Sequence, residues 1–337
     1  MSVKCNRKPN TSGKPVFVTQ DPAMKHLYKK VRLVARSRAP VFIAGESGTG
    51  KEVLARLLHY HSTRSNQPFV ALNCGALPED IVESELFGHE KGSFTGALDR
   101  KKGCFEQSDG GVLFLDEVGE MSPQIQVKLL RAVEQKNFRR VGGTEEVHTD
   151  VQIISATNRN ITEMMSSGNF RDDLYYRLSV IELYIPPLRE RPGDIPLLCE
   201  FFLNKYADEY GLPVKEFSAK SIKLLMDYNW PGNVRELCNV VERCAIMCDE
   251  KIIKSFYLPG PVGGSGMTSL NFKNGKNGHG NQKFVQIPVG TSMENAERLI
   301  INQTLSHTEN NISKAARILG VSRNTLHNKL SKFGEQQ

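Results

Sequence analysis

The stretch GESGTGKE, residues 45–52, decides the fold of the central part of this chain. It follows the apolar run VFI at 41–43 and precedes a helical pattern with Val53, Leu54, Leu57 and Leu58 on one side. A strand, a glycine-rich loop and a helix in this order are the context of a phosphate-binding loop. The glycines let backbone N–H groups point at phosphates, and the helix N-terminus adds its positive end.

Within this loop, Lys51 is expected to reach the β- and γ-phosphates of a nucleotide. Glu52 stands where such loops usually carry the Ser or Thr that contacts magnesium, so we expect Glu52 to hold the ion through water. The candidate nucleotide contacts are Gly45, Glu46, Ser47, Gly48, Thr49, Gly50, Lys51 and Glu52.

The stretch GGVLFLDEVGEM, residues 110–121, supplies the second half of the site. Its apolar run at 112–115 predicts a strand that is buried on both faces of a parallel sheet. The run ends in Asp116, which can hold Mg²⁺, and Glu117, which can orient and deprotonate the attacking water. The two stretches together predict an ATPase with ATP and Mg²⁺ as its cofactors.

Another buried strand is expected at 151–154, and the polar Thr157 and Asn158 that follow it predict a sensor of the γ-phosphate. Strands and helices alternate from Val16 to about Pro187, which predicts an α/β fold with a doubly wound parallel sheet. Helical patterns continue to about Leu258, where we expect a small helical lid on the sheet domain.

The bulk composition excludes several classes of protein. The 337 residues are 39% hydrophobic and 24% charged, which is ordinary for a soluble globular protein of two or three domains. No apolar run approaches the roughly 18 residues of a membrane span and no signal peptide is visible, so we expect a cytoplasmic protein. The seven cysteines form no C-x-x-C pair, and Cys244 and Cys248 are interpreted as buried small hydrophobes.

The net charge of +7 arises at the two ends of the chain. Residues 1–39 carry ten Lys and Arg against one acid, whereas residues 40–261 carry 25 against 32. A basic end can bind nucleic acid or can equally be a solvated tail, and charge alone leaves both interpretations open.

Six stretches in one order make the chain resemble a known family over nearly its whole length. They are GESGTGKE, ELFGHEKGSFTGA, GGVLFLDE, FRDDLYYRL, PPLRERPGDI and WPGNVREL. This order is similar to that of the sigma-54-dependent transcription activators, bacterial enhancer-binding proteins of the AAA+ class. The resemblance implies an ATPase that assembles from dimers into a hexameric ring and remodels sigma-54 RNA polymerase holoenzyme so that promoters open.

The segment GHEKGSFTGALD, residues 88–99, gains its meaning from this resemblance. In the family it reads GAFTGA and forms the tip of a loop that touches sigma-54 during ATP turnover. The corresponding residues are Gly92, Ser93, Phe94, Thr95, Gly96 and Ala97. Ser93 replaces the usual alanine, and we expect its hydroxyl to be tolerated at an exposed tip. A glycine-rich surface loop without a partner is the alternative.

The resemblance also implies roles for four further residues. Asn73 matches the residue that restrains the catalytic glutamate until the γ-phosphate and the partner are sensed. Arg171 and Arg177 match arginines offered to a neighbouring subunit's ATP, where such a finger raises the rate roughly 10³–10⁵-fold. Either arginine could instead form a structural salt bridge. Arg235 matches the lid arginine that reads the nucleotide state.

The C-terminal part of the chain predicts a linker followed by three helices. Residues 260–283 are rich in Gly and Asn without a hydrophobic period, which indicates a flexible linker. Thr291 and Glu294 form a candidate capping box, Gly320 ends the second helix, and Ser322 caps the third. The expected inward residues are Ala296, Leu299, Ile300, Ile312, Ala315, Ala316, Leu319, Leu326 and Leu330.

Small alanines, a glycine turn and a following polar-basic helix are typical of a helix-turn-helix. The stretch NISKAARILGVSRNTLHNKL also resembles the Fis-type DNA-binding domain of the same activators. The third helix is expected to enter the major groove of double-stranded DNA at an upstream enhancer site. The candidate DNA contacts are Ser322, Arg323, Asn324, Thr325, His327, Asn328 and Lys329. A helical cap that binds protein is the alternative.

The expected organisation has five parts: a polar basic tail (1–15), an AAA+ P-loop ATPase subdomain (16–187), a helical lid (188–258), a flexible linker (259–285) and a Fis-type helix-turn-helix domain (286–337). Many members of the family carry an N-terminal regulatory domain, whereas about fifteen polar residues precede the ATPase here. Either a regulator acts in trans, or such a domain has been removed.

Two other functions stay open at this point. One is a DNA-binding regulator that acts with ordinary sigma factors and uses ATP only to control its oligomeric state. The other is an AAA+ remodeller or helicase loader that acts on other proteins or on DNA. The Phe94–Thr95 pair and the terminal helix-turn-helix favour the sigma-54 activator.

Overall fold

The computed structural model describes residues 15–94, 96–254, 256–258, 268–270, 293–308 and 311–334. The chain divides into two compact units, Met1–Phe256 and Tyr257–Gln337, and each is described by itself. Residues 1–14 of the predicted tail, most of the predicted linker, Thr291 and Thr95 lie outside the described residues.

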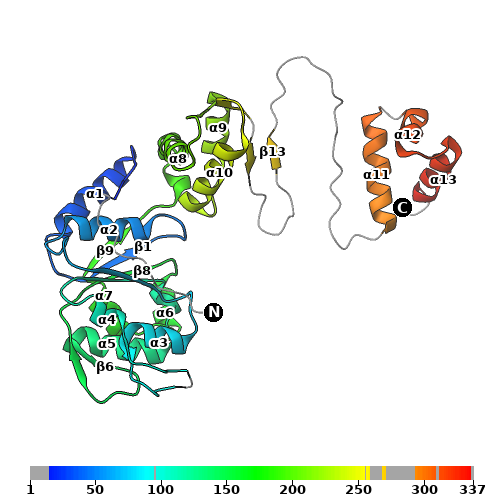
Figure 1. The fold of residues 1–337 in the computed structure, drawn as a ribbon. Helices are drawn as coiled ribbons and strands as arrows, with labels where there is room; N and C mark the ends of the chain where they lie inside the picture. Colours follow the sequence, from blue (N-terminus) through cyan, green and yellow to red (C-terminus); the bar gives the residue numbers. More distant parts are fainter. Residues whose placement is uncertain are drawn as a thin grey trace. The chain divides into compact units, whose positions relative to one another are not determined.

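A five-stranded parallel sheet forms the centre of the first unit (Figure 1). Its strand order is β2-β5-β8-β1-β9, and every neighbouring pair is parallel. The strands are β1 (Val41–Ala44), β2 (Phe69–Asn73), β5 (Val112–Asp116), β8 (Gln152–Thr157) and β9 (Ile181–Tyr184). The predicted α/β class with a parallel sheet is confirmed.

Helices cover both faces of this sheet, which explains why the central strands are apolar without alternation. Val41, Ile43 and Phe114 pack in one buried cluster with residues of α1 (Pro22–Val34) and α2 (Lys51–His61). Leu113 and Leu115 point the other way, into a cluster formed with further helices. These are α3 (Glu79–Phe87), α4 (Cys104–Gln107), α5 (Pro123–Gln135), α6 (Ile161–Ser166) and α7 (Asp172–Leu178).

The α2 helix departs from the expected pattern at one position. Leu54, Leu57 and Leu58 are buried as predicted, but Val53 is 42% exposed. The buried side of α2 is formed by Lys51, Leu54, Ala55, Leu57 and Leu58. Val53 therefore lies on the solvent side of the helix.

Two antiparallel hairpins lie outside the central sheet. β3 (Gly88–His89) pairs with β4 (Lys101–Lys102), and β6 (Asn137–Arg139) pairs with β7 (Glu146–His148). The short helix η1 (Val118–Glu120) follows β5 directly. Ser122 then caps α5, its hydroxyl accepting from the Ile125 N–H, and Pro123 occupies the first helical turn.

The rest of the first unit is mostly helical. It comprises η2 (Leu188–Glu190), α8 (Asp194–Tyr210), α9 (Ala219–Asp227) and α10 (Asn233–Met247), with β10 (Glu216–Phe217) parallel to β11 (Ile252–Ile253). Trp230 is fully buried and donates its indole N–H to the Leu225 carbonyl at 2.7 Å. Further along the chain, β12 (Phe256–Leu258) pairs with β13 (Thr268–Leu270).

Six cysteines lie among the described residues and all are free thiols. Cys244 is buried as predicted, and burial raises the pKa of its thiol to about 12. Cys248 follows the end of α10 and is only half-buried. Within the described ranges, no helix has the length and apolar character needed to cross a membrane.

The described residues of the second unit beyond β13 form three helices: α11 (Met293–His307), α12 (Ile312–Leu319) and α13 (Arg323–Gly334). Their buried residues are Ile301, Ala315, Ala316 and Leu326. Gly320 ends α12 in the left-handed conformation, and the Ser322 hydroxyl accepts from the Thr325 N–H at 3.1 Å, as a cap for α13.

The predicted inner face of α11 needs a correction. Leu299 is 40% exposed, whereas Ile301 is 3% exposed and packs on the two alanines of α12. The helix therefore presents the face of Ile301 and Leu305 to its neighbours, one residue further along the chain than expected.

Leu326→Ala tests the core of the second unit. The side chain is fully buried, so its truncation should lower the free energy of unfolding by about 2–5 kcal/mol. Hydrogen exchange of residues 293–334 in the full chain measures the change. Ile318→Ala is the control, because Ile318 is 60% exposed and its loss should cost at most about 0.5 kcal/mol. Equal losses in both variants would contradict the packing described.

Candidate nucleotide-binding site

The glycine-rich loop joins β1 to α2 with two residues in left-handed conformations, Gly48 at φ +77° and Gly50 at φ +106°. Lys51 begins α2 and is 7% exposed. Its ammonium group donates to the carbonyls of Gly45 at 2.8 Å and Glu46 at 3.2 Å. Burial lowers the pKa of Lys51, and the carboxylates of Asp116 and Glu117 oppose that shift. The lysine therefore lies inside the loop, where phosphate oxygens could replace the two carbonyls.

Parallel pairing brings the ends of four strands to the same edge of the sheet. Asn73 lies opposite Asp116 in the register of β2 and β5, and Ala44 lies opposite Thr157 in that of β1 and β8. The Gly45 N–H donates to the Thr157 carbonyl at 3.3 Å. The phosphate loop, Asp116 and Thr157 are thus neighbours, as the sequence pattern predicts.

Asp116 and Glu117 occupy costly positions at this edge. Burial raises the pKa of Asp116, with the Lys51 charge acting in the opposite direction. Glu117 has φ +57°, a left-handed conformation that costs a non-glycine residue about 1–2 kcal/mol. Its carboxylate lies over Gly75, where a Cβ atom would stand 2.5 Å from Oε2. Such costs are typical of residues that are held for chemistry.

Asn73 makes a local contact at the end of β2. Its side-chain oxygen accepts from the N–H groups of Gly75 at 2.9 Å and Ala76 at 3.0 Å. The described contacts include no hydrogen bond between Asn73 and Glu117. Asn73 therefore fixes the turn over which the Glu117 carboxylate lies.

Three other predicted contacts differ in their surroundings. Thr157 is 1% exposed and its hydroxyl accepts from the Arg159 N–H at 3.1 Å, whereas Asn158 is exposed. Glu52 lies on the surface of α2 in an ion pair with Arg56 at 2.7 Å. The Glu52 carboxylate is thus paired with a residue of its own helix.

The helical lid is hydrogen-bonded directly to the phosphate loop. The Arg235 N–H donates to the Gly48 carbonyl at 3.2 Å, and its guanidinium lies 3.1 Å from the Ser47 hydroxyl. Asn233 is fully buried, and its amide donates to the Glu46 carboxylate at 3.1 Å and the Ser47 carbonyl at 3.0 Å. A Cβ on Gly48 would lie 2.3 Å from the Gly232 carbonyl oxygen. Only glycine allows this approach of lid and loop.

A bidentate ion pair adds to these contacts. Arg189 binds both carboxylate oxygens of Glu46, at 2.6 and 2.8 Å, and this hydrogen bonding lowers the pKa of Glu46. Neither Arg189 nor Asn233 was among the residues predicted to line the site. The signal was present, because they lie within PPLRERPGDI and WPGNVREL.

The two candidate arginine fingers, Arg171 and Arg177, differ in their ion pairs. Arg171 forms a bidentate pair with Asp173 at 2.6 and 3.0 Å. Arg177 is exposed at the end of α7 and has no ion pair with any described residue. Neither arginine contacts the phosphate loop within the described part of its own chain.

The turn around Phe94 presents an aromatic side chain. Phe94 is 47% exposed and packs edge-on against His89, with ring centroids 5.0 Å apart. The Gly92 N–H donates to the Ala97 carbonyl at 2.8 Å, and both Gly92 and Gly96 have positive φ. The turn is thus closed by its own backbone, as a presenting loop requires.

Ser93 does not lie at an exposed tip, contrary to the expectation. Its hydroxyl is buried and has no hydrogen-bond partner in the part of the chain that the structure describes, and a Cβ on Gly142 would lie 2.6 Å from the Ser93 Cβ. The residue packs against the β6–β7 hairpin because the base of the Phe94 turn is joined to that hairpin. The Glu90 N–H donates to the Val141 carbonyl at 3.0 Å, and the Val141 N–H donates to the Gly88 carbonyl at 2.9 Å.

Arg140 reinforces this junction. It is 5% exposed and its guanidinium contacts three carboxylates: Glu106 at 2.7 Å, Glu90 at 3.0 Å and Glu145 at 3.3 Å. Hydrogen bonding to Glu106 is the main cause of a raised pKa at Arg140. Its sequence position carries no motif, so this contact could not have been predicted.

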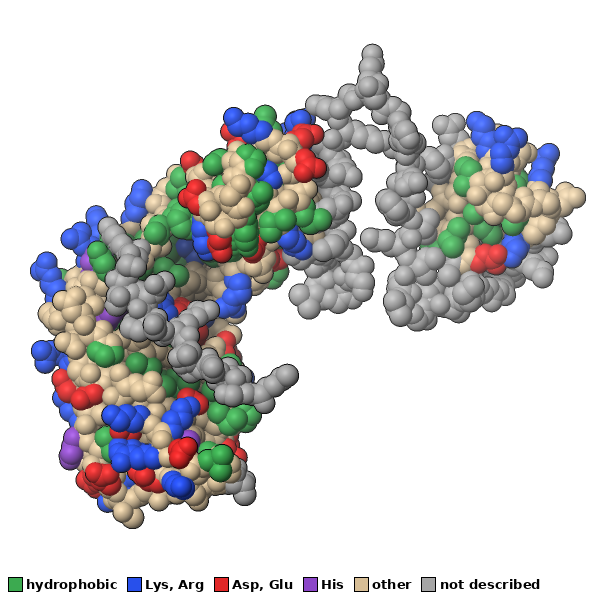
Figure 2. Space-filling view, in the orientation of Figure 1, with side chains coloured by type: hydrophobic (Ala, Val, Ile, Leu, Met, Phe, Trp, Pro, Cys, Tyr) green, Lys and Arg blue, Asp and Glu red, His purple; other side chains and the backbone are tan. Residues whose placement is uncertain are grey.

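In the second unit, α13 carries the candidate DNA contacts. Arg323, Asn324, Thr325 and His327 are exposed, and Ser322 is the helix cap. Lys329 lies 2.5 Å from Glu297 of α11 in an ion pair, which places it in the helix packing. The Asn328 side chain lies outside the described residues. Figure 2 shows most of the visible Lys and Arg side chains of this unit grouped on one side.

Comparisons with known protein families cover most of the chain. Residues 17–184 match the sigma-54 interaction domain, residues 189–269 match the AAA+ ATPase lid domain, and residues 292–333 match the bacterial regulatory proteins of the Fis family. Fold and site together define an AAA+ ATPase with an attached helix-turn-helix domain.

Individual proteins give the same result. The chain is 42% identical to the transcriptional regulatory protein FlbD of Caulobacter vibrioides, covering 96% of this chain and 72% of FlbD. It is 43% identical to ZraR of Escherichia coli (94% and 68%) and 44% identical to the nitrogen fixation protein AnfA of Azotobacter vinelandii (92% and 56%). It therefore spans a little over half of AnfA and about two thirds of ZraR.

Solved structures of NtrX from Brucella abortus, in complexes with ADP and with ATP, have TM-scores of 0.72 to this chain at 34% identity. Each alignment covers 96% of this chain and 70% of NtrX. The chain belongs to the family of sigma-54-dependent transcription activators. Its sigma-54 interaction domain fits this family better than it fits regulators that act with ordinary sigma factors.

Asp116→Asn should stabilise the nucleotide-free protein at neutral pH. Because the folded pKa of Asp116 is raised above 3.8, the folded state holds the proton more tightly than the unfolded chain. The stability of the wild type therefore falls as pH rises through a window that begins near 3.8, whereas asparagine stays neutral. Thermal melting should show a higher midpoint for the variant at pH 7.5 and a smaller difference at pH 4.

The exposed Asp99→Asn is the control and should shift the midpoint by at most about 1 °C at either pH. A lower midpoint for Asp116→Asn than for the wild type at pH 7.5 would show that the charged carboxylate stabilises the fold.

Ser93→Ala should leave the free energy of unfolding unchanged or raise it by up to about 1 kcal/mol, because no described residue forms a hydrogen bond with the buried hydroxyl. Urea unfolding measures the change. Ser108→Ala is the matched control: Ser108 is fully buried and donates to the Cys104 carbonyl at 2.7 Å, so its loss should cost about 1 kcal/mol. Similar losses in both variants would mean that the Ser93 hydroxyl is hydrogen-bonded.

Proposed function

We propose that this protein is an ATP-hydrolysing transcription activator that binds upstream DNA and remodels sigma-54 RNA polymerase holoenzyme to open promoters. The observation that carries the proposal is the half-exposed Phe94 on a closed turn, connected by one short segment to the catalytic edge of the sheet. That segment runs from Asn73 through α3 to the turn. A change at the edge can therefore be transmitted to the exposed aromatic side chain.

The hydrolytic step uses groups at the sheet edge. Lys51 and the loop N–H groups bind the β- and γ-phosphates of ATP, and Glu117 accepts the proton of the attacking water. Thr157 ends the next strand of the sheet. In this proposal its role is to respond to the γ-phosphate. Contacts from Asn233 and Arg235 make the lid position depend on the loop, and hence on the nucleotide.

The residues present fit a magnesium site. Asp116 offers a carboxylate beside Lys51, and among the described hydrogen bonds its side chain takes part in one, in which Oδ1 accepts from the Glu117 N–H at 3.0 Å. Oxygen donors of this kind suit Mg²⁺, which when bound neutralises charge on the phosphates. Glu52 would join through water only by leaving Arg56.

Assembly into a ring completes the site in this proposal. Arg177 is our candidate for the main arginine finger. Both arginines are exposed, but Arg171 is paired with Asp173 whereas Arg177 has no ion pair with a described residue. A planar guanidinium donated by a neighbouring subunit would neutralise charge on the transferring phosphoryl group. Dimers that form a hexamer would place one such arginine at each nucleotide.

The second unit supplies the DNA contact. A short exposed segment of α13, with Arg323, Asn324 and Thr325 at its start, fits the geometry of a recognition helix in the major groove. Lys329 is less suited to base contact, because Glu297 already binds it.

The proposal is tested by the complex with sigma-54 in the presence of ADP–aluminium fluoride, which mimics the phosphoryl transition state. The wild type should co-elute with sigma-54 only with this analogue, and Phe94→Ala should abolish the complex while ATP turnover stays within about twofold of wild type. Leu98→Ala is the matched control, since Leu98 is 79% exposed on the same loop and should be dispensable.

Glu117→Gln serves as the catalytic control and should bind ATP but lose turnover by about 10²–10⁴-fold. Failure of the wild type to bind sigma-54, in protein shown to hydrolyse ATP and form rings, would favour a regulator that acts with ordinary sigma factors. Normal hydrolysis by Glu117→Gln would refute the assigned base.

A further inference from the structure

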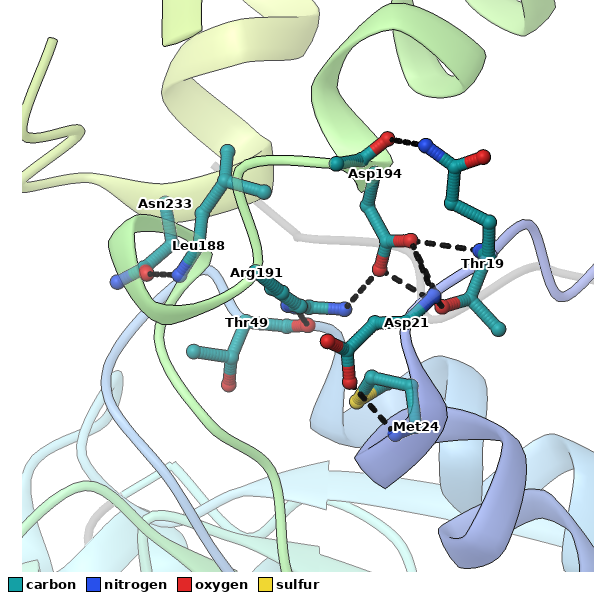
Figure 3. Close-up of polar contacts among 10 residues, drawn as sticks. Thr19, Asp21, Met24, Thr49, Leu188, Arg191, Asp194 and Asn233 are labelled. Carbon is teal, nitrogen blue, oxygen red and sulfur yellow. Dashed lines mark hydrogen bonds and ion pairs between the residues drawn. The ribbon is translucent and has the colours of Figure 1, made fainter. Parts of the chain in front are cut away.

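A buried ion pair that the proposed mechanism does not use lies between the lid, the phosphate loop and the segment before α1 (Figure 3). Its members are Asp194, fully buried at the start of α8, and Arg191, which is 4% exposed. Figure 3 shows Arg191 between Asp194 and Thr49, with Thr19 and Asp21 on the far side of Asp194.

Asp194 holds the chain segment that leads into α1. The Thr19 hydroxyl lies 2.8 Å from both carboxylate oxygens, and Oδ1 accepts from the backbone N–H groups of Gln20 at 2.7 Å and Asp21 at 3.1 Å. The Gln20 side chain also donates to the Gly193 carbonyl. Because a buried carboxylate is costly without such donors, the segment and Asp194 stabilise each other's positions.

The same segment fixes the start of α1. The Asp21 side chain accepts from the Met24 N–H at 3.0 Å, which makes Asp21 the helix cap. Any movement of residues 19–21 therefore changes the hydrogen bonds to Asp194 and the cap of α1 at the same time.

Arg191 connects Asp194 to the phosphate loop. Its guanidinium lies 3.7 Å from the Asp194 carboxylate and donates to the Thr49 carbonyl at 3.1 Å. The Nε donor of the same guanidinium is buried and has no hydrogen-bond partner among the described residues. Without Asp194, the buried guanidinium would keep one neutral acceptor, so its hold on Thr49 depends on the carboxylate.

Thr49 is a sensitive point in the loop. It lies between Gly48 and Gly50, both in left-handed conformations, and its hydroxyl donates to the Glu46 carbonyl at 2.8 Å. A shift of the Thr49 carbonyl therefore changes the direction of the N–H groups that face the phosphates.

We infer that Arg191 and Asp194 are positioning residues that couple the segment at residues 19–21 to the phosphate loop, so that nucleotide affinity depends on how this segment is held. A partner or domain that displaces residues 19–21 would act on nucleotide binding through this pair. This inference rests on the proposed binding of ATP by the loop. It predicts that Thr19, which lies outside the loop, affects nucleotide affinity through its hydrogen bond to Asp194.

The test uses Thr19→Val and Asp194→Asn in the full chain, with the dissociation constant of a fluorescent ATP analogue as the readout. Both variants should weaken nucleotide binding by roughly 3- to 30-fold. The turnover number at saturating ATP should stay within about twofold of wild type, because the catalytic groups are untouched. The double variant should be no weaker than Asp194→Asn alone.

Thr19→Ser keeps the hydroxyl and should restore wild-type affinity. Thr63→Val is the control. Thr63 is exposed and follows the C-terminal end of α2, so loss of its hydroxyl should leave nucleotide affinity unchanged. Unchanged affinity in both Thr19→Val and Asp194→Asn, with only a lower melting temperature, would overturn the inference and leave the pair a purely structural role. A wild type that binds the analogue normally but forms no sigma-54 complex would count against the proposed function and not against the coupling.

Discussion

The parallel pairing of β2, β5, β8 and β1 is the constraint on which the rest of the structure depends. Because parallel strands end at one edge, Asn73, Asp116, Thr157 and the phosphate loop become neighbours although they are far apart in the sequence. No contact between their side chains is needed to bring them together. The sheet does this through backbone hydrogen bonds and the packing of its two apolar faces.

Several groups at this edge are held at a cost to stability. The Asp116 carboxylate is desolvated, Glu117 has a left-handed backbone, and the Lys51 ammonium is buried inside the loop. The surrounding sheet and the lid offset these costs. Arg189 and Asn233 add hydrogen bonds to the loop from outside, so the lid and the loop behave as one structural element.

The sequence predicted the strands, the phosphate loop and the edge carboxylates because each depends on local residue types. The apolar run at 112–115 and the glycines at 48 and 50 act through their own backbone. Long-range contacts were harder to predict. Ser93 was expected at the surface, yet its hydroxyl is buried and its Cβ lies against Gly142, a residue far along the chain. Arg140 likewise depends on Glu106 and Glu90, which a single sequence does not connect to it.

The approach of Gly48 to Gly232 has a consequence for how this protein can vary. Lid and loop meet here backbone to backbone, with no side chain that could be exchanged for another. The Glu46–Arg189 pair beside them is different, since two partly exposed charges can change as a matched pair. Substitution at this junction is thus restricted in two ways. The Glu46–Arg189 pair can be replaced by complementary side chains, whereas position 48 accepts glycine alone.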